Sequence, residues 1–240
     1  MIGALVFVAW TRFLRTPRAW LAALAWWAIA LAVAVLSHRE GILHGADRSL
    51  LGTYGGLALP LLSYSIAGGV WGVGGVARSI APVVALGAPP AWAAAATIAV
   101  CGAACAIQGA LLGATVAVIA HGLSDPPRIH DGLVTAYVGG LGGLAYAGWF
   151  SLGASFGRRG GGRTAALVIN WALGPWAEST AVVTPLGHVQ NMLGGVPPLG
   201  ISERASAIAL LAMAGVFGWA AAMRARSAPR SIGDRRRSVI

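Results

Sequence analysis

The chain has 240 residues, of which 57% are hydrophobic and only 10% are charged. A soluble domain carries roughly 25% charged residues, so this composition excludes an ordinary soluble enzyme and favours a membrane protein. The chain has 17 arginines, no lysine and 7 acidic residues. Because a Walker-type phosphate loop needs a lysine, the chain does not hydrolyse ATP through that motif.

Membrane-spanning segments dominate the chain. A crossing helix needs about 20 mostly apolar residues to traverse a hydrocarbon core of roughly 30 Å. The sequence predicts an all-α, polytopic membrane protein whose six spans cover residues 19–36, 50–76, 91–120, 132–152, 164–183 and 205–223. The fifth span is irregular because its apolar run is short and stops at Pro175, so this segment either crosses or dips in and returns.

The segment before the first span, residues 2–18, has an apolar body with Arg12, Arg15 and Arg18 toward one end. This pattern is typical of an amphipathic helix that lies in the membrane interface. A plain positive anchor for the first span accounts for it equally well.

Three further segments lie outside the spans. Residues 77–92 predict a short interfacial helix and a turn before the third span, because Pro90 suits a first helical position. The outer segment 178–203 is apolar but interrupted by prolines and glycines, which predicts short helices at one mouth of the protein. Residues 224–240 form a polar, arginine-rich tail.

Loop charges predict the orientation, because positively charged loops stay in the cytoplasm. With both termini cytoplasmic, thirteen arginines lie inside: Arg12, Arg15, Arg18, Arg78, Arg158, Arg159, Arg163, Arg224, Arg226, Arg230, Arg235, Arg236 and Arg237. Four lie outside: Arg39, Arg48, Arg128 and Arg204. All the acidic residues except Asp234 also fall outside, which supports an even number of crossings.

Polar side chains within the spans are few. Gln108 and Asn170 are the deep ones, and such groups either hydrogen-bond between helices or line a pathway. Cys101 and Cys105 lie one helical turn apart and are read as packing residues. No histidine pair has a metal-ligand spacing such as H-E-x-x-H, and the G-x-S-x-G match at residues 153–157 lacks a histidine at similar depth.

The arrangement resembles the ABC-2 type permease family, the membrane subunits of ATP-binding-cassette exporters. RFLRTPRAWL at residues 12–21 looks like that family's arginine-rich approach to the first span. RSIAPVVALGAPPAW at residues 78–92 looks like its coupling helix, and TPLGHVQNMLGG at residues 184–195 like its outer stretch before the last span.

The resemblance implies a permease subunit that forms a translocation pathway as a dimer in the bacterial inner membrane. It implies coupling to the ATPase through Arg12, Arg15, Arg78, Ser79, Ala81, Pro82, Val83 and Leu86. It implies an outer gate at Pro185, His188, Gln190 and Asn191. ATP and magnesium would be held by separate cytoplasmic ATPase subunits, and no cofactor, metal or nucleic acid by this chain; its other partners would be membrane lipids and a second permease chain.

One departure from the family pattern concerns the coupling segment. Arg78 and Ser79 stand where the family usually has acidic residues, and Ala81-Pro82 where it has Gly-Thr. This departure suggests that a different permease chain supplies part of the ATPase contact in a heterodimer, although a homodimer remains an alternative.

Two other functions compete with the permease. A secondary transporter usually keeps charged residues within its spans for ion coupling, and the absence of charge from five of the six spans counts against it. The other alternative is a non-transporting integral membrane protein, such as an assembly factor.

Overall fold

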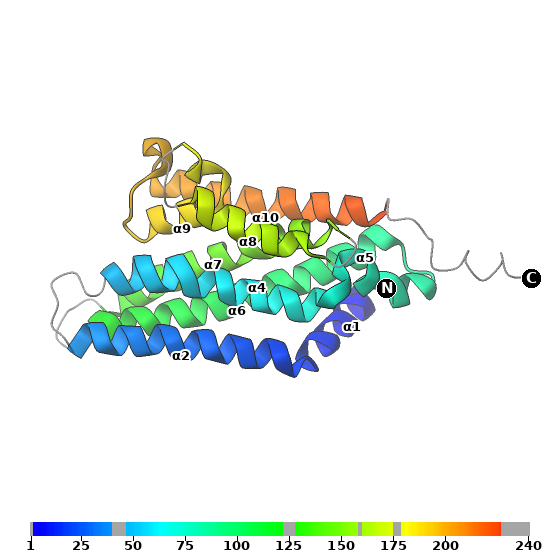
Figure 1. Cartoon of the computed structure of the whole chain (residues 1–240), viewed down its shortest axis with the longest axis horizontal. Coiled ribbons are helices and arrows are strands. Elements are labelled where there is room, and N and C mark those ends of the chain that lie inside the picture. The colour runs from blue at the N-terminus through cyan, green and yellow to red at the C-terminus, as the bar shows by residue number, and fades with distance from the viewer. Residues whose placement is uncertain (1, 40–46, 122–127, 158–159, 175–178, 227–240) are drawn as a thin grey trace, which may run out of the picture.

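The computed structural model describes residues 2–39, 47–121, 128–157, 160–174 and 179–226, and these form a bundle of helices along one long axis (Figure 1). The described residues contain no β-strand. In chain order the helices are α1 (Ile2–Leu14), α2 (Pro17–Arg39), η1 (Arg48–Ala58), α4 (Leu59–Trp71), η2 (Gly72–Gly74), α5 (Gly75–Ala85), α6 (Pro90–His121), α7 (Arg128–Ala154), α8 (Gly162–Leu173), η3 (Ala181–Val183), α9 (Pro185–Met192), η4 (Pro198–Gly200) and α10 (Glu203–Arg226).

Five helical stretches are long and apolar enough to cross a membrane: Pro17–His38, Arg48–Ala85, Pro90–His121, Ile129–Ala154 and Glu203–Arg226. The prediction of a helical membrane protein is therefore supported. Each stretch overlaps one of the predicted spans. Four differ from it by up to three residues at either end, whereas the second stretch runs on to Ala85 because it includes α5.

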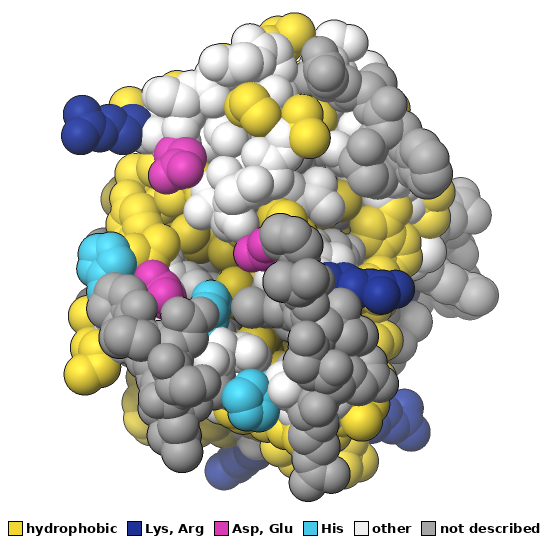
Figure 2. All heavy atoms as spheres, turned by 90° about the vertical axis from the view of Figure 1, so that its left-hand side faces the viewer, with side chains coloured by type: hydrophobic (Ala, Val, Ile, Leu, Met, Phe, Trp, Pro, Cys, Tyr) yellow, Lys and Arg dark blue, Asp and Glu magenta, His cyan; other side chains and the backbone are white. Residues whose placement is uncertain are grey.

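The two ends of the bundle differ in charge. The right-hand end in Figure 1 holds α1, α5, the start of α8 and the end of α10, and we call it the arginine-rich end. The opposite end holds the starts of η1, α7 and α10, where the described acidic residues Asp47, Asp131 and Glu203 lie; we call it the acidic end. Figure 2 shows acidic and histidine side chains gathered on this face.

The first two helices meet in an elbow. The single helix expected over residues 2–18 ends at Leu14, and α2 begins at Pro17 because proline is accommodated in the first turn of a helix but not in its interior. Arg15 therefore lies between the helices and Arg18 belongs to α2. Phe13 fills the elbow, with its ring centroid 5.1 Å from that of Trp20.

The second of these long stretches is composite. Its first half, η1, is wound as a π-helix and runs directly into α4. The chain turns at Gly72–Gly74, where Gly72 and Gly75 have φ values of +60° and +69° that favour glycine, and then continues as α5. The helix expected after residue 76 thus begins earlier, at Gly75, and α6 begins at Pro90 after a short turn.

Glycines determine how closely α6 and α7 pack at the centre of the bundle. A Cβ on Gly139 would overlap the carbonyl oxygen of Gly109, and a Cβ on Gly143 would overlap the Cys105 carbonyl. The Tyr54 hydroxyl reaches into this contact from η1 and donates to the Gly109 carbonyl at 2.7 Å. Small residues at helical spacing let these backbones approach, as is common in membrane helix pairs.

The fifth predicted span, residues 164–183, is not one continuous helix. Helix α8 has 12 residues, or about 18 Å at 1.5 Å per residue, which is short of a full crossing. After it come η3 and α9, both near the acidic end (Figure 1). Two indoles fix α8: Trp149 donates to the Ala166 carbonyl at 2.8 Å, and Trp171 donates to the Gly56 carbonyl at 2.9 Å.

Candidate functional site

The residues expected to contact an ATPase lie mainly on α5, at the arginine-rich end. Arg78 and Pro82 are exposed, and Leu86, just beyond the end of the helix, is 87% exposed. Ala81 and Val83 are half-buried. Ser79 is buried and its hydroxyl donates to the Val76 carbonyl at 2.7 Å, so it stabilises the helix rather than presenting itself to a partner.

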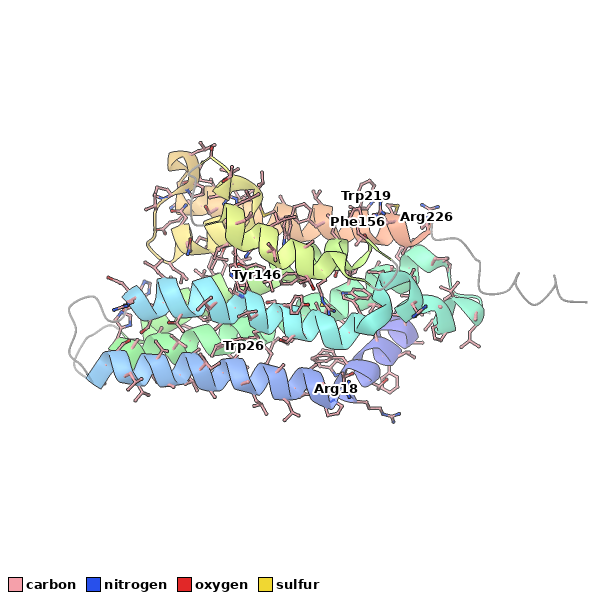
Figure 3. The ribbon with its side chains drawn as sticks, viewed as in Figure 1. Arg18, Trp26, Tyr146, Phe156, Trp219 and Arg226 are labelled. Carbon is pink, nitrogen blue, oxygen red and sulfur yellow. The ribbon has the colours of Figure 1, made fainter. Side chains whose placement is uncertain are left out.

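The two N-terminal arginines of the predicted contact lie at the same end of the bundle. Arg15 is exposed in the elbow between α1 and α2. Arg12 belongs to α1, and its side chain lies outside the described part. Figure 3 shows the side chain of the neighbouring Arg18 projecting away from the bundle at this end.

A small hollow of about 220 Å³ connects the predicted coupling elements. Leu5, Val8 and Ala9 of α1 line one side. The other walls come from Ser79, Ile80, Pro82 and Val83 of α5, and from Ala93 and Thr97 of α6. Helices α1 and α5, 60 residues apart in sequence, therefore share one surface whose floor is the start of α6.

A close backbone contact joins the start of α5 to the connection between α7 and α8. A Cβ on Gly75 would overlap the Ala154 carbonyl and approach the Gly160 Cα to 3.2 Å. Gly160 itself has a φ of +65°. The start of α5 therefore lies directly against the end of α7 and the loop that leads into α8. The sequence offers only its glycine-rich loop as a sign of this contact.

Arg163 links α8 to α4 at the same end. Its guanidinium carbon lies 4.7 Å from the centroid of the Tyr64 ring, a cation–π geometry. The Tyr64 hydroxyl and the Thr164 hydroxyl are 2.9 Å apart. The guanidinium passes over Gly68, where a Cβ would lie only 3.3 Å from one of its nitrogens. The buried Nε atom of Arg163 has no hydrogen-bond partner among the described residues.

The two deep polar residues both make hydrogen bonds between elements. Gln108 accepts from the Trp27 indole of α2 at 3.1 Å. The Asn170 carbonyl oxygen accepts from the backbone N–H of Leu186 at 3.2 Å, and its amide lies 3.5 Å from the Tyr146 hydroxyl. Each of the two residues therefore hydrogen-bonds to another element of the bundle, as the helix-linking alternative expects.

The four outer-gate residues lie on α9 at the acidic end. Pro185 is the buried first residue of this helix, and Gln190 is half-buried. His188 is 1% exposed, with Nδ1 at 3.1 Å from the Ser206 hydroxyl and Nε2 at 2.8 Å from the Val182 carbonyl oxygen. The Asn191 amide donates to the Ser206 hydroxyl at 2.8 Å and to the Ile201 carbonyl at 3.1 Å.

This polar cluster ties α9 to α10 through Ser206. Burial lowers the pKa of His188 below its ordinary value, although its bond to the Val182 carbonyl opposes the shift. A neutral imidazole is one donor and one acceptor, which matches a carbonyl on one side and a hydroxyl on the other. The sequence singled out His188 and Asn191, but it gave no sign of their shared partner Ser206.

The cysteines and the serine singled out in the sequence show no arrangement for catalysis in the described residues. Cys101 and Cys105 are free and buried in α6. The Ser155 hydroxyl donates to the Leu152 carbonyl at 2.6 Å at the end of α7, in a helical turn rather than a strand-to-helix elbow. Across the described ranges, no group of three histidine, cysteine or acidic side chains is placed to hold a metal ion.

The fold and these contacts define a helical membrane protein with an amphipathic helix pair at its arginine-rich end and a polar helix cap at its acidic end. The sequence matches no family model and no curated protein, and the structure matches no solved structure.

Proposed function

We propose that the chain is the permease subunit of an ABC exporter, working as a dimer with separate cytoplasmic ATPase subunits. Both termini lie in the cytoplasm of a bacterial cell whose inner membrane the protein spans. Helix α8 and η3 belong to the fifth of six crossings and α9 lies at its outer end, since α10 starts at the acidic end and α8 starts at the other.

One observation carries the proposal: α5 is an exposed helix joined to a spanning helix through a glycine turn. Arg78 on α5 is exposed and does not line the hollow, and the exposed Leu86 follows the helix. Its buried face shares a hollow with α1. An ATPase that pushes on this surface would move α4 through the Gly72–Gly74 turn and would move the ends of α7 and α8 through the Gly75–Gly160 contact.

The way the long helices pack favours transport that is driven by a separate ATPase rather than by an ion gradient. The long stretches pack through an apolar core and close glycine contacts, and the Trp27–Gln108 hydrogen bond joins two of them. Ion-coupled transporters usually place paired ionisable groups within their membrane-spanning helices. The dimeric pathway would form between two such bundles, with the α9 cluster at its outer mouth.

The experiment is co-purification with the ATPase encoded by an adjacent reading frame. Leu86→Asp places a charge on an exposed apolar residue of the proposed contact, and Val196→Asp does the same at the other end of the bundle, where Val196 is 73% exposed. Burying a leucine contributes about 1.5–3 kcal/mol, so Leu86→Asp is expected to weaken ATPase retention about tenfold or more. Val196→Asp should retain the ATPase.

Two results would contradict the proposal. One is ATP hydrolysis by this chain purified alone, because the proposal assigns that chemistry to the partner. The other is equal retention of the ATPase by both variants. Transport driven by an ion gradient in vesicles without any ATPase would instead favour the secondary transporter.

A further inference from the structure

A second, larger hollow lies on the outside of the bundle near the arginine-rich end. It is a groove of about 420 Å³ between the first turns of α6 and the last turns of α10. That volume falls within the range of ligand sites, about 300–1,000 Å³. Both walls belong to helices long enough to cross a membrane, so the groove opens toward lipid.

Small residues and two tryptophans line the groove. Ala95 and Ala99 line it from α6, and Gly215 lines it from α10. The side chains of Trp92 and Trp219 line it as well and are 55% and 66% exposed. Tryptophan is enriched at the level of lipid head groups, so these residues suit the boundary between hydrocarbon and water.

An arginine lies beside the groove, in contact with one of its lining residues. Residues 215, 219, 222 and 226 of α10 follow one another at helical spacing and share a face. Arg226 donates to the sulfur of Met223 at 3.6 Å, and Met223 lines the groove. Figure 3 shows Trp219 and Arg226 projecting from the outer side of α10 at the same end.

No acidic side chain among the described residues lies at this end to neutralise Arg226. An apolar groove in contact with lipid, with a tryptophan edge and a guanidinium beyond it, matches an amphiphile with a hydrocarbon chain and an anionic head group. We infer that this groove binds one anionic phospholipid, with an acyl chain between α6 and α10 and its phosphate on Arg226. The inference does not depend on the proposed function, since it needs only that α6 and α10 face the membrane.

Gly215 offers a clean way to fill the groove. A Cβ at this position would meet no atom within 4 Å, whereas one on Gly218 would lie 3.3 Å from Ile98. Gly215→Leu therefore places a side chain in the groove without displacing its walls, and leucine favours a helix more than glycine does. Ala212→Leu is the matched control, because Ala212 is exposed on the same helix but does not line the groove.

The test is native mass spectrometry of the full chain in detergent, titrated with phosphatidylglycerol or phosphatidylcholine of the same acyl chains. The unmodified chain should bind phosphatidylglycerol more tightly. Arg226→Gln should weaken that binding about fivefold, the factor that corresponds to about 1 kcal/mol for one arginine near an anionic surface, and should leave phosphatidylcholine unchanged. Arg204→Gln, an exposed arginine at the opposite end of α10, should change neither.

Gly215→Leu should weaken binding of both lipids by at least tenfold, and Ala212→Leu should not. Equal affinity of the unmodified chain for the two lipids, or unchanged binding in Gly215→Leu, would overturn the inference. The same spectra report the oligomeric state. If Gly215→Leu separates a dimer while lipid binding stays the same, the groove is a contact between copies of this chain and not a lipid site.

Discussion

The glycine contact between α6 and α7 yields a sharp prediction about stability. Gly139→Ala would place a methyl group against the Gly109 carbonyl and the Tyr54 hydroxyl, and the Gly109 carbonyl carbon would lie only 2.7 Å from the new atom. Two of these obstacles belong to backbone, so the helices must separate. We expect a large loss of stability from this one methyl group.

The magnitude follows from two contributions. Overpacking a well-filled core typically costs about 1–3 kcal/mol. Moving Tyr54 also breaks its 2.7 Å hydrogen bond to Gly109, worth about 1 kcal/mol. Against these two contributions, alanine favours a helix over glycine by about 1 kcal/mol, so Gly139→Ala should lower the free energy of unfolding by about 1–3 kcal/mol. Tyr54→Phe, which removes only the hydrogen bond, should cost about 1 kcal/mol.

The assay is equilibrium unfolding of the purified chain in detergent, followed by circular dichroism. Gly215→Ala is the control, since its methyl group meets open space, and it should unfold at the same point as the unmodified chain or later. In the double variant Gly139→Ala/Tyr54→Phe, the missing hydroxyl relieves part of the clash. The loss of unfolding free energy should therefore be smaller than the sum of the losses in the two single variants. A Gly139→Ala chain as stable as the original would refute the reasoning.

Three further predictions use the same unfolding assay. Asn170→Ala leaves the buried Leu186 N–H without its acceptor and should cost about 1–3 kcal/mol; no loss would show that this bond is dispensable. Because burial lowers the pKa of His188, the unfolded chain takes up its proton first, so stability should fall as pH drops below about 6.5. His188→Gln should reduce that pH dependence and His130→Gln, at an exposed position, should not; equal effects would contradict the assignment. Gly75→Ala should destabilise more than Gly72→Ala, because both have positive φ but only Gly75 lies against another backbone, and the reverse order would refute the contact.

The spans were largely predictable because their signal is local. A run without charge over about 20 residues is expensive to expose to water and suits hydrocarbon whatever its neighbours are. The helix start at Pro90 was also marked locally, since proline fixes its own φ. The elbow at residues 15–16 and the turn at Gly72–Gly74 were not placed correctly from the sequence, because the extent of each helix depends on what it packs against.

The roles of single side chains were less predictable. The sequence left Gln108 and Asn170 as either linkers or pathway residues, and only the structure shows their partners Trp27, Tyr146 and Leu186. A hydrogen-bond partner 81 residues away leaves no trace in local spacing. The clusters around Ser206 and Arg163 stayed unnoticed for the same reason.

Composition and charge order, by themselves, determined that this chain is a helical membrane protein with one arginine-rich end, because transfer of charge into hydrocarbon is costly at every position. Tertiary structure decided which helices touch, where a helix turns, and that α1 and α5 share a hollow while α6 and α10 enclose a groove. Those features depend on shape complementarity between segments far apart in sequence. A glycine allows close packing only where another backbone lies opposite it, and an indole N–H links two helices only where an acceptor lies within reach.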